Sequence, residues 1–116
     1  MNTNRKVCFR EIERDIRWGR VPNSPEILYG YLSDCEAVAG ILEESAAKDL
    51  VRRLIDLLVE VICDTSVPYH WRCLCLDNLH RPVRCLREKV RTPKERIELN
   101  RKVHEINTLA GYFLIQ

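Results

Sequence analysis

TPKERIELNRKVHEINTLAGYF, residues 92–113, contains the strongest local signal for secondary structure in this chain. Thr92 supplies a helix cap, Pro93 suits the first helical position, and Glu95 lies three residues past the cap, where its carboxylate can reach back. A helix is therefore predicted to begin here. Along it the apolar side chains recur at steps of four and three, the a/d spacing of a two-heptad seam. The seam consists of Leu99, Val103, Ile106, Ala110 and Phe113.

The sequence before this helix also has the spacing of amphipathic helices. A first helix is predicted over about residues 4–18, and Gly19 and Pro22 are expected to end it. A second helix is predicted to start at Ser24-Pro25-Glu26, which offers a cap, a proline at the first helical position and an acid in the first turn.

The stretch 25–63 is predicted to form one long helix or two. We expect a break between Gly40 and Ser45, because glycine weakens a helix interior. The apolar stripe expected to face the core continues through the whole stretch. Its positions are Leu28, Leu32, Cys35, Ala39, Leu42, Ala46, Leu50, Leu54, Leu57 and Val61.

The middle of the chain is predicted to hold a loop over residues 64–68 and a short helix over 69–80, which Pro82 kinks or ends. Nothing in the sequence alternates with a period of two over a useful length. The predicted fold class is all-α: a single compact bundle of four to six helices with a long C-terminal amphipathic helix. One domain is expected over residues 1–116.

The composition is that of a folded helical protein, with 46% hydrophobic and 31% charged residues. These values argue against a disordered chain and against a membrane protein, and no membrane partner is expected. The first residues lack the apolar core of a signal peptide, so we expect a cytoplasmic or nuclear protein whose six cysteines are reduced.

Charge is divided into three blocks, although the whole chain sums to only +2. Residues 1–20 carry a net +3, residues 26–64 a net −6, and residues 72–102 a net +6. The acidic and basic blocks can pair with each other inside the protein, or the basic block can face an acidic partner. The second case predicts a small nucleic-acid-binding regulator, with Trp71 stacking on bases. Its binding residues would be Arg72, Arg81, Arg84, Arg87, Lys89 and Arg91.

Cysteines and histidines gather within sixteen residues, as a zinc site would require. The candidate ligands are His70, Cys73, Cys75, His80 and Cys85. A single residue separates Cys73 from Cys75, which points the two thiols to different sides of a helix. We therefore expect no metal and no cofactor, and keep zinc only as a stabiliser of the nucleic-acid-binding alternative.

Cys73 and Cys85 are candidate nucleophiles, because neighbouring arginines are expected to lower the pKa of their thiols. No glycine-rich loop, oxyanion-forming turn or ordered Cys/His/Asp set accompanies them. We expect no catalytic residues and no enzyme.

The favoured function is that of a non-enzymatic interaction or regulatory protein. An amphipathic helix that ends in aromatic residues is typical of a surface that binds another helix. We expect the seam of residues 99–113 to bind a protein partner, with self-association into a homodimer or other homo-oligomer as the favoured case.

Overall fold

The computed structural model describes the backbone of residues 2–114 and the side chains of residues 9–114. Within this range the chain forms six helices and no strand, which confirms the all-α bundle with a long C-terminal helix. The helices are α1 (Asn2–Trp18), α2 (Pro25–Ile41), α3 (Glu44–Ile62), α4 (Tyr69–Asp77), α5 (His80–Lys89) and α6 (Pro93–Phe113).

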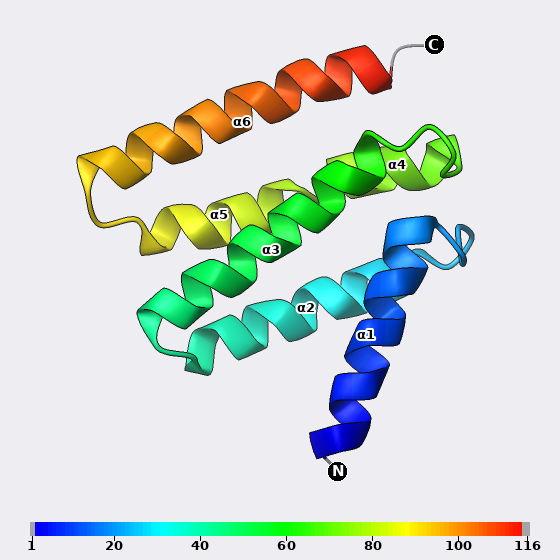
Figure 1. The fold of residues 1–116 in the computed structure, drawn as a ribbon, viewed down its shortest axis with the longest axis horizontal. Helices are drawn as coiled ribbons and strands as arrows, with labels where there is room; N and C mark the ends of the chain where they lie inside the picture. Colours follow the sequence, from blue (N-terminus) through cyan, green and yellow to red (C-terminus); the bar gives the residue numbers. More distant parts are fainter. Residues whose placement is uncertain (1, 115–116) are drawn as a thin grey trace.

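Helix α3 is the centre of the bundle, because it contacts each of the five other helices. The molecule is flat, with extents of 41 × 38 × 16 Å along its principal axes. Figure 1 shows α2 and α3 as an antiparallel pair, α6 lying along one edge, and α1 crossing the opposite side with its N-terminal half projecting from the bundle.

The core surrounds α3, and its buried apolar side chains form one cluster. Trp71 on α4 is completely buried, and its Nε1–H donates to the carbonyl oxygen of Ile16 on α1 at 2.9 Å. The largest side chains with almost no exposed surface are Trp71, Ile16, Leu28, Leu32, Leu58, Ile62 and Val61. Removing this apolar surface from water is the main stabilising contribution to such a fold.

The predicted break between Gly40 and Ser45 is confirmed. Leu42 leaves the helical conformation, and the carboxylate of Glu43 accepts a hydrogen bond from the backbone N–H of Ala46 at 2.8 Å. An acid at this position satisfies a backbone donor that the first turn of α3 would otherwise leave unpaired.

Two predicted helix starts are also confirmed, with one difference in detail. Thr92 Oγ1 accepts from the N–H of Glu95 at 3.1 Å, as the capping motif requires. Helix α2 begins at Pro25 as expected, but the Ser24 hydroxyl makes no capping hydrogen bond.

The predicted helix over residues 69–80 is shorter than expected, because α4 ends at Asp77 and a new helix begins at His80. The interruption expected near Pro82 is thus present, but it falls at residues 78–79, and Pro82 itself lies in the first turn of α5. Proline is tolerated there because the N–H groups of a first turn have no partner within the helix.

The turn after α1 fits closely against the loop before α4. Gly19 has φ +60, and a Cβ at this position would lie 2.7 Å from Cγ1 of Val67 and 3.1 Å from Cδ of Pro68. Both the backbone conformation and the available space therefore require glycine.

Candidate interaction surfaces

The heptad seam of α6 lies inside the bundle. Leu99, Ile106 and Ala110 are buried, while Val103 and Phe113 are half-buried. Helix α6 presents this face to α3 and α5 of its own chain. The side chains expected to bind a partner are thus already covered within one molecule, so self-association would have to use another surface.

Arg72 has a structural position rather than the exposed one expected for a nucleic-acid contact. Its side chain is buried, with Nε donating to the carbonyl oxygen of Val67 at 3.1 Å and Nη1 to that of Phe113 at 3.1 Å. Trp71 is buried as well and cannot stack on a base without unfolding. Two elements of the nucleic-acid hypothesis are therefore corrected.

The acidic and basic blocks pair with each other across the bundle. Arg81 on α5 bonds to Glu36 on α2, and Lys102 on α6 lies 3.3 Å from Asp56 on α3. Arg91 Nε donates to Glu44 at 2.6 Å. These contacts use two further residues of the predicted nucleic-acid surface.

Three residues of that surface remain, on α5. Arg84 and Arg87 are exposed and Lys89 is half-buried. No ion pair within 4.0 Å involves them in the part of the chain whose side chains are described. The basic patch left on α5 is therefore much smaller than the six-residue surface predicted from sequence.

The candidate zinc ligands are not brought together. His70 Nε2 lies 2.9 Å from the carbonyl oxygen of Pro22, and His80 Nδ1 lies 2.9 Å from that of Asp77. Cys75 is completely buried in the core. Among the described residues no three His, Cys, Asp or Glu side chains are placed to hold a metal ion.

The expected activation of a thiol is wrong for Cys85. Burial raises the pKa of Cys85, and Glu88 and Glu36 raise it further, while Lys89 alone opposes them. A thiol with a raised pKa is a poor nucleophile at neutral pH. Cys73, the other candidate, is half-buried on α4.

A cleft of about 250 Å³ lies between α3, α5 and α6. Its walls combine apolar side chains such as Ile55 and Leu99 with the charged pair formed by Lys102 and Asp56. Sites for small-molecule ligands usually begin at about 300 Å³, so this cleft is small for a ligand site.

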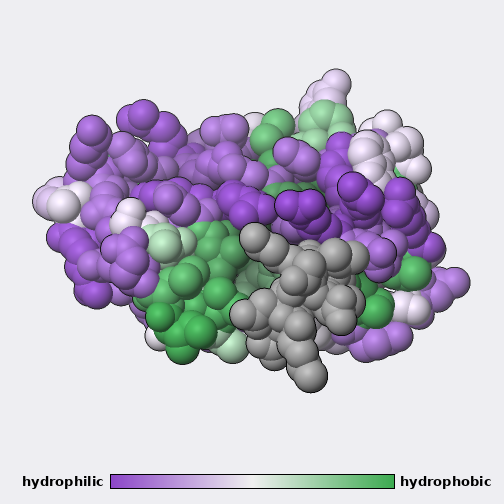
Figure 2. All heavy atoms as spheres, turned by 60° about the horizontal axis from the view of Figure 1, so that its bottom comes forward, coloured by the Kyte–Doolittle hydropathy of each residue, from purple (hydrophilic) through white to green (hydrophobic). Residues whose placement is uncertain are grey.

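Apolar side chains are left exposed at the junction of α2 and α3. Ile41 is 85% exposed, Leu42 is 40% exposed and Val38 is 37% exposed. We call these three residues the turn patch. Figure 2 shows a contiguous hydrophobic area over this end of α2. The patch is not evident from the sequence, because Leu42 continues the apolar spacing of the stripe predicted to face the core.

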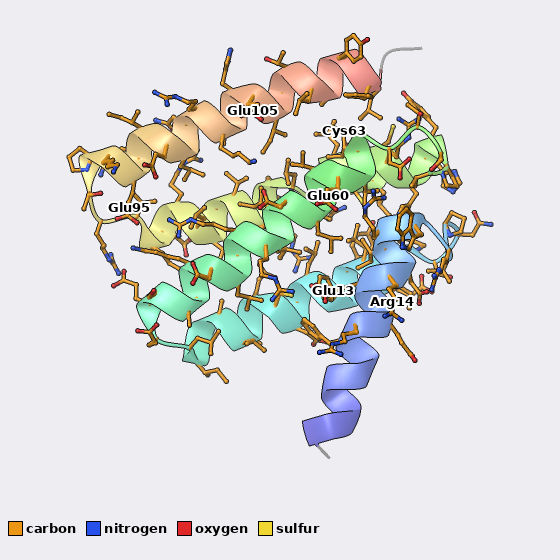
Figure 3. All side chains as sticks on the ribbon, in the orientation of Figure 1. Glu13, Arg14, Glu60, Cys63, Glu95 and Glu105 are labelled. Atoms are coloured by element: carbon orange, nitrogen blue, oxygen red, sulfur yellow. The ribbon has the colours of Figure 1, made fainter. Side chains whose placement is uncertain are left out.

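A second surface lies between α1 and α3, where a shallow groove of about 300 Å³ is open to solvent. We call it the α1/α3 groove. It is lined by Arg10, Glu13, Arg14, Arg17, Trp18 and Leu57. Figure 3 labels Glu13 and Arg14 on α1 and Glu60 on α3 at the edge of this region.

The charges in the α1/α3 groove are only partly neutralised. Arg17 lies 3.2 Å from Glu60 and 2.7 Å from Asp64, and its guanidinium stacks 4.3 Å from the ring centre of Trp18. Hydrogen bonds from Ser66 and Arg17 lower the pKa of Asp64 to about 2, so this carboxylate stays charged.

The other charged side chains of the groove are Glu13, which has partners, and the arginines Arg10 and Arg14. Glu13 accepts a hydrogen bond from the hydroxyl of Tyr31 at 2.8 Å and lies 3.7 Å from Arg53. Arg10 and Arg14 are exposed, and neither forms an ion pair with any residue whose side chain is described. The groove therefore presents two unneutralised cations beside the apolar Trp18 and Leu57.

Comparison of the chain with protein-family models, with curated proteins and with solved structures finds no match. No helix in the described residues is both long enough and apolar enough to cross a membrane.

Proposed function

We propose that this chain is a non-enzymatic helical interaction protein that acts through protein–protein contacts and self-associates. The observation that carries the proposal is the turn patch, in which Ile41 is 85% exposed beside Val38 and Leu42. Contiguous exposed apolar side chains are typical of surfaces that bind another protein.

Because the seam of α6 is buried, the proposed contact lies at the turn patch and not at the seam expected from sequence. With α6 packed on α3 and α5, the turn patch offers apolar contact without opening the bundle. Covering an Ile or Leu side chain contributes about 1.5–3 kcal/mol, so a patch of this size supports a weak to moderate complex.

Sedimentation velocity and light scattering test this proposal over protein concentrations from about 10 to about 500 μM, the range of weak complexes. We expect the mean mass to rise above 13.7 kDa as concentration increases. The substitution Ile41→Asp should return the protein to a monomer. Ile97→Asp is the matched control, because Ile97 is 58% exposed and lies on α6, which contributes no residue to the turn patch.

A wild-type protein that stays monomeric over the whole range would reject self-association. Equal loss of association in Ile41→Asp and Ile97→Asp would reject the turn patch as its site. Circular dichroism of both variants checks that each retains the helical fold.

Binding of nucleic acid is the second candidate, and the basic patch left on α5, with Arg84 and Arg87 exposed and Lys89 half-buried, favours it. Arg84→Glu with Arg87→Glu would abolish binding to a fluorescent single-stranded oligonucleotide if this role is correct. A binding constant that does not depend on salt, or that the double variant leaves unchanged, would reject it.

A further inference from the structure

We infer that the α2–α3 turn of one copy docks into the α1/α3 groove of a second copy, in a head-to-tail arrangement. The inference deepens the proposed self-association and rests on it, since it names the surface that receives the turn patch. The occupant of the groove is thus another molecule of the same chain.

The two surfaces are complementary in chemistry. The turn carries the exposed apolar Ile41 followed by the acids Glu43 and Glu44. The groove carries the apolar Leu57 and Trp18 beside Arg10 and Arg14, which form no ion pair with any described side chain. An apolar side chain flanked by acids fits an apolar floor flanked by bases.

The carboxylates of Glu43 and Glu44 are accessible for such a contact, because both side chains are exposed. Glu43 accepts one hydrogen bond within the described residues, from the N–H of Ala46, and its side chain is exposed. Glu44 is bonded to Arg91, but its side chain is still 48% exposed. Each acid can therefore accept a further hydrogen bond from an arginine.

Charge favours the head-to-tail arrangement over a symmetric contact between two turn patches. In a symmetric contact the same surface faces itself, so Glu43 and Glu44 of one copy would lie near the same acids of the other. Like charges placed together in an interface oppose association. Docking in the groove replaces this repulsion with attraction to Arg10 and Arg14.

A molecule cannot fill its own groove with its own turn. Leu57 lies thirteen residues after Glu44 on α3, which corresponds to roughly 20 Å along the helix axis. Figure 1 shows the α2–α3 turn at one end of the helix pair and the crossing of α1 toward the other end. The contact must therefore join different molecules.

A polyanionic nucleic acid fits the groove less well than the acidic turn does. Glu13, Glu60 and Asp64 lie in or beside the groove and would oppose an extended phosphate backbone. A short turn with two acids can reach Arg10 and Arg14 without following the acidic rim.

The experiment uses a turn variant, Ile41→Asp, and a groove variant, Arg10→Glu with Arg14→Glu. Arg84→Glu with Arg87→Glu is the matched control, because it makes the same charge change at two exposed arginines on α5. We expect the turn and groove variants each to weaken association by about tenfold or more, and the control to associate like the wild type.

Mixing the turn variant with the groove variant gives the decisive measurement. Each lacks one half of the contact, so the mixture can form one intact contact between an unaltered turn and an unaltered groove. We expect a 1:1 complex of about 27 kDa, twice the chain mass of 13.7 kDa, and no larger species. The wild type should continue to grow beyond two copies as concentration rises.

Other outcomes separate the failure of this inference from the failure of the proposed function. A groove variant that associates like the wild type, while the turn variant does not, would overturn head-to-tail docking and leave self-association standing. A mixture that stays monomeric would overturn the docking as well. A monomeric wild type would overturn both, and binding of a single-stranded oligonucleotide lost only in the groove variant would reassign the groove to nucleic acid.

Discussion

The Arg72 guanidinium donates Nη1–H to the carbonyl oxygen of Phe113 at 3.1 Å, across 41 residues of sequence. The same side chain donates Nε–H to the carbonyl oxygen of Val67 and is only 7% exposed. Arginine is rarely this buried unless its donors are paired. Arg72 therefore holds the end of α6 against the start of α4.

Replacing this side chain should loosen the C-terminal end of α6. We expect Arg72→Met to lower the free energy of unfolding by about 2 to 3 kcal/mol, because two carbonyl oxygens lose their donor. Urea denaturation measures the change. Arg84→Met is the control, since Arg84 is exposed on α5, and it should change stability by less than about 0.5 kcal/mol. Equal effects of the two substitutions would contradict the structural role of Arg72.

Because the α6 seam faces the core, alanine substitution of two isoleucines of this helix should change the free energy of unfolding by very different amounts. Ile106 is 3% exposed and Ile97 is 58% exposed. Ile106→Ala should lower the free energy of unfolding by about 2 to 5 kcal/mol, because it leaves a cavity in the core. Ile97→Ala should have little effect. If Ile97→Ala destabilises the protein and Ile106→Ala does not, the seam is exposed rather than buried.

The close packing of the turn at Gly19 predicts that alanine substitutions at two glycines change the free energy of unfolding in opposite directions. Gly19→Ala should destabilise the fold by about 2 to 4 kcal/mol, because it combines a positive φ with a steric clash against Val67. Gly30 lies in the middle of α2, and an added Cβ there meets nothing within 4 Å. Gly30→Ala should therefore stabilise by about 0.5 to 1 kcal/mol. Thermal unfolding of both variants compares them directly.

The charge of Glu95 predicts a dependence of stability on pH. A hydrogen bond from Lys48, followed by one from the backbone N–H of Arg91, lowers the pKa of Glu95 to about 2. A carboxyl whose pKa is lower in the folded state stabilises it above its unfolded pKa of about 4.3, and loses this contribution as pH falls toward about 2.

Substitution of Glu95 checks this relationship. Denaturation between about pH 5 and about pH 2 should show a weaker pH dependence for Glu95→Gln than for the wild type. Glu105→Gln is the control on the same helix, because Glu105 is exposed and forms no ion pair among the described residues (Figure 3). If the free energy of unfolding of Glu95→Gln depends on pH as steeply as that of the wild type, the pairing of Glu95 with Lys48 is contradicted.

Burial predicts an order of reactivity for the cysteines. Burial raises the pKa of Cys75 to about 12 and is the main cause that raises the pKa of Cys35 to about 11, so neither holds much thiolate at neutral pH. We expect iodoacetamide to modify Cys63 and Cys73, which are half-buried, well before these two. Mass spectrometry of the native and the urea-unfolded protein should show Cys35 and Cys75 modified only after unfolding.

Helix boundaries were largely predictable because their signals act locally. The hydroxyl of Thr92 needs only the N–H three residues ahead, and glycine near residue 40 weakens a helix whatever surrounds it. The interruption near Pro82 was predictable too, but its exact position was not, because proline can also occupy the first turn of the next helix. Inside a helix proline breaks the structure, whereas in a first turn it fits.

The location of the sites was less predictable because a sequence pattern does not show which partner covers it. The seam of α6 has the same spacing whether it packs on its own chain or on another copy. The sequence does not distinguish Arg72 from its basic neighbours, because its acceptor, the carbonyl oxygen of Phe113, lies 41 residues away in the chain. Leu42 continues the stripe of α2, but it leaves the helix and is exposed.

The loop before α4 and the start of that helix meet both α1 and α6. Trp71 bonds to the carbonyl oxygen of Ile16, and Arg72 bonds to that of Phe113. A ribosome delivers residues in order, so α1 to α5 can assemble while Arg72 still lacks one acceptor. Docking of α6 then follows the assembly of α1 to α5, and translation halted within α6 would release a bundle with an unsatisfied cation at its edge.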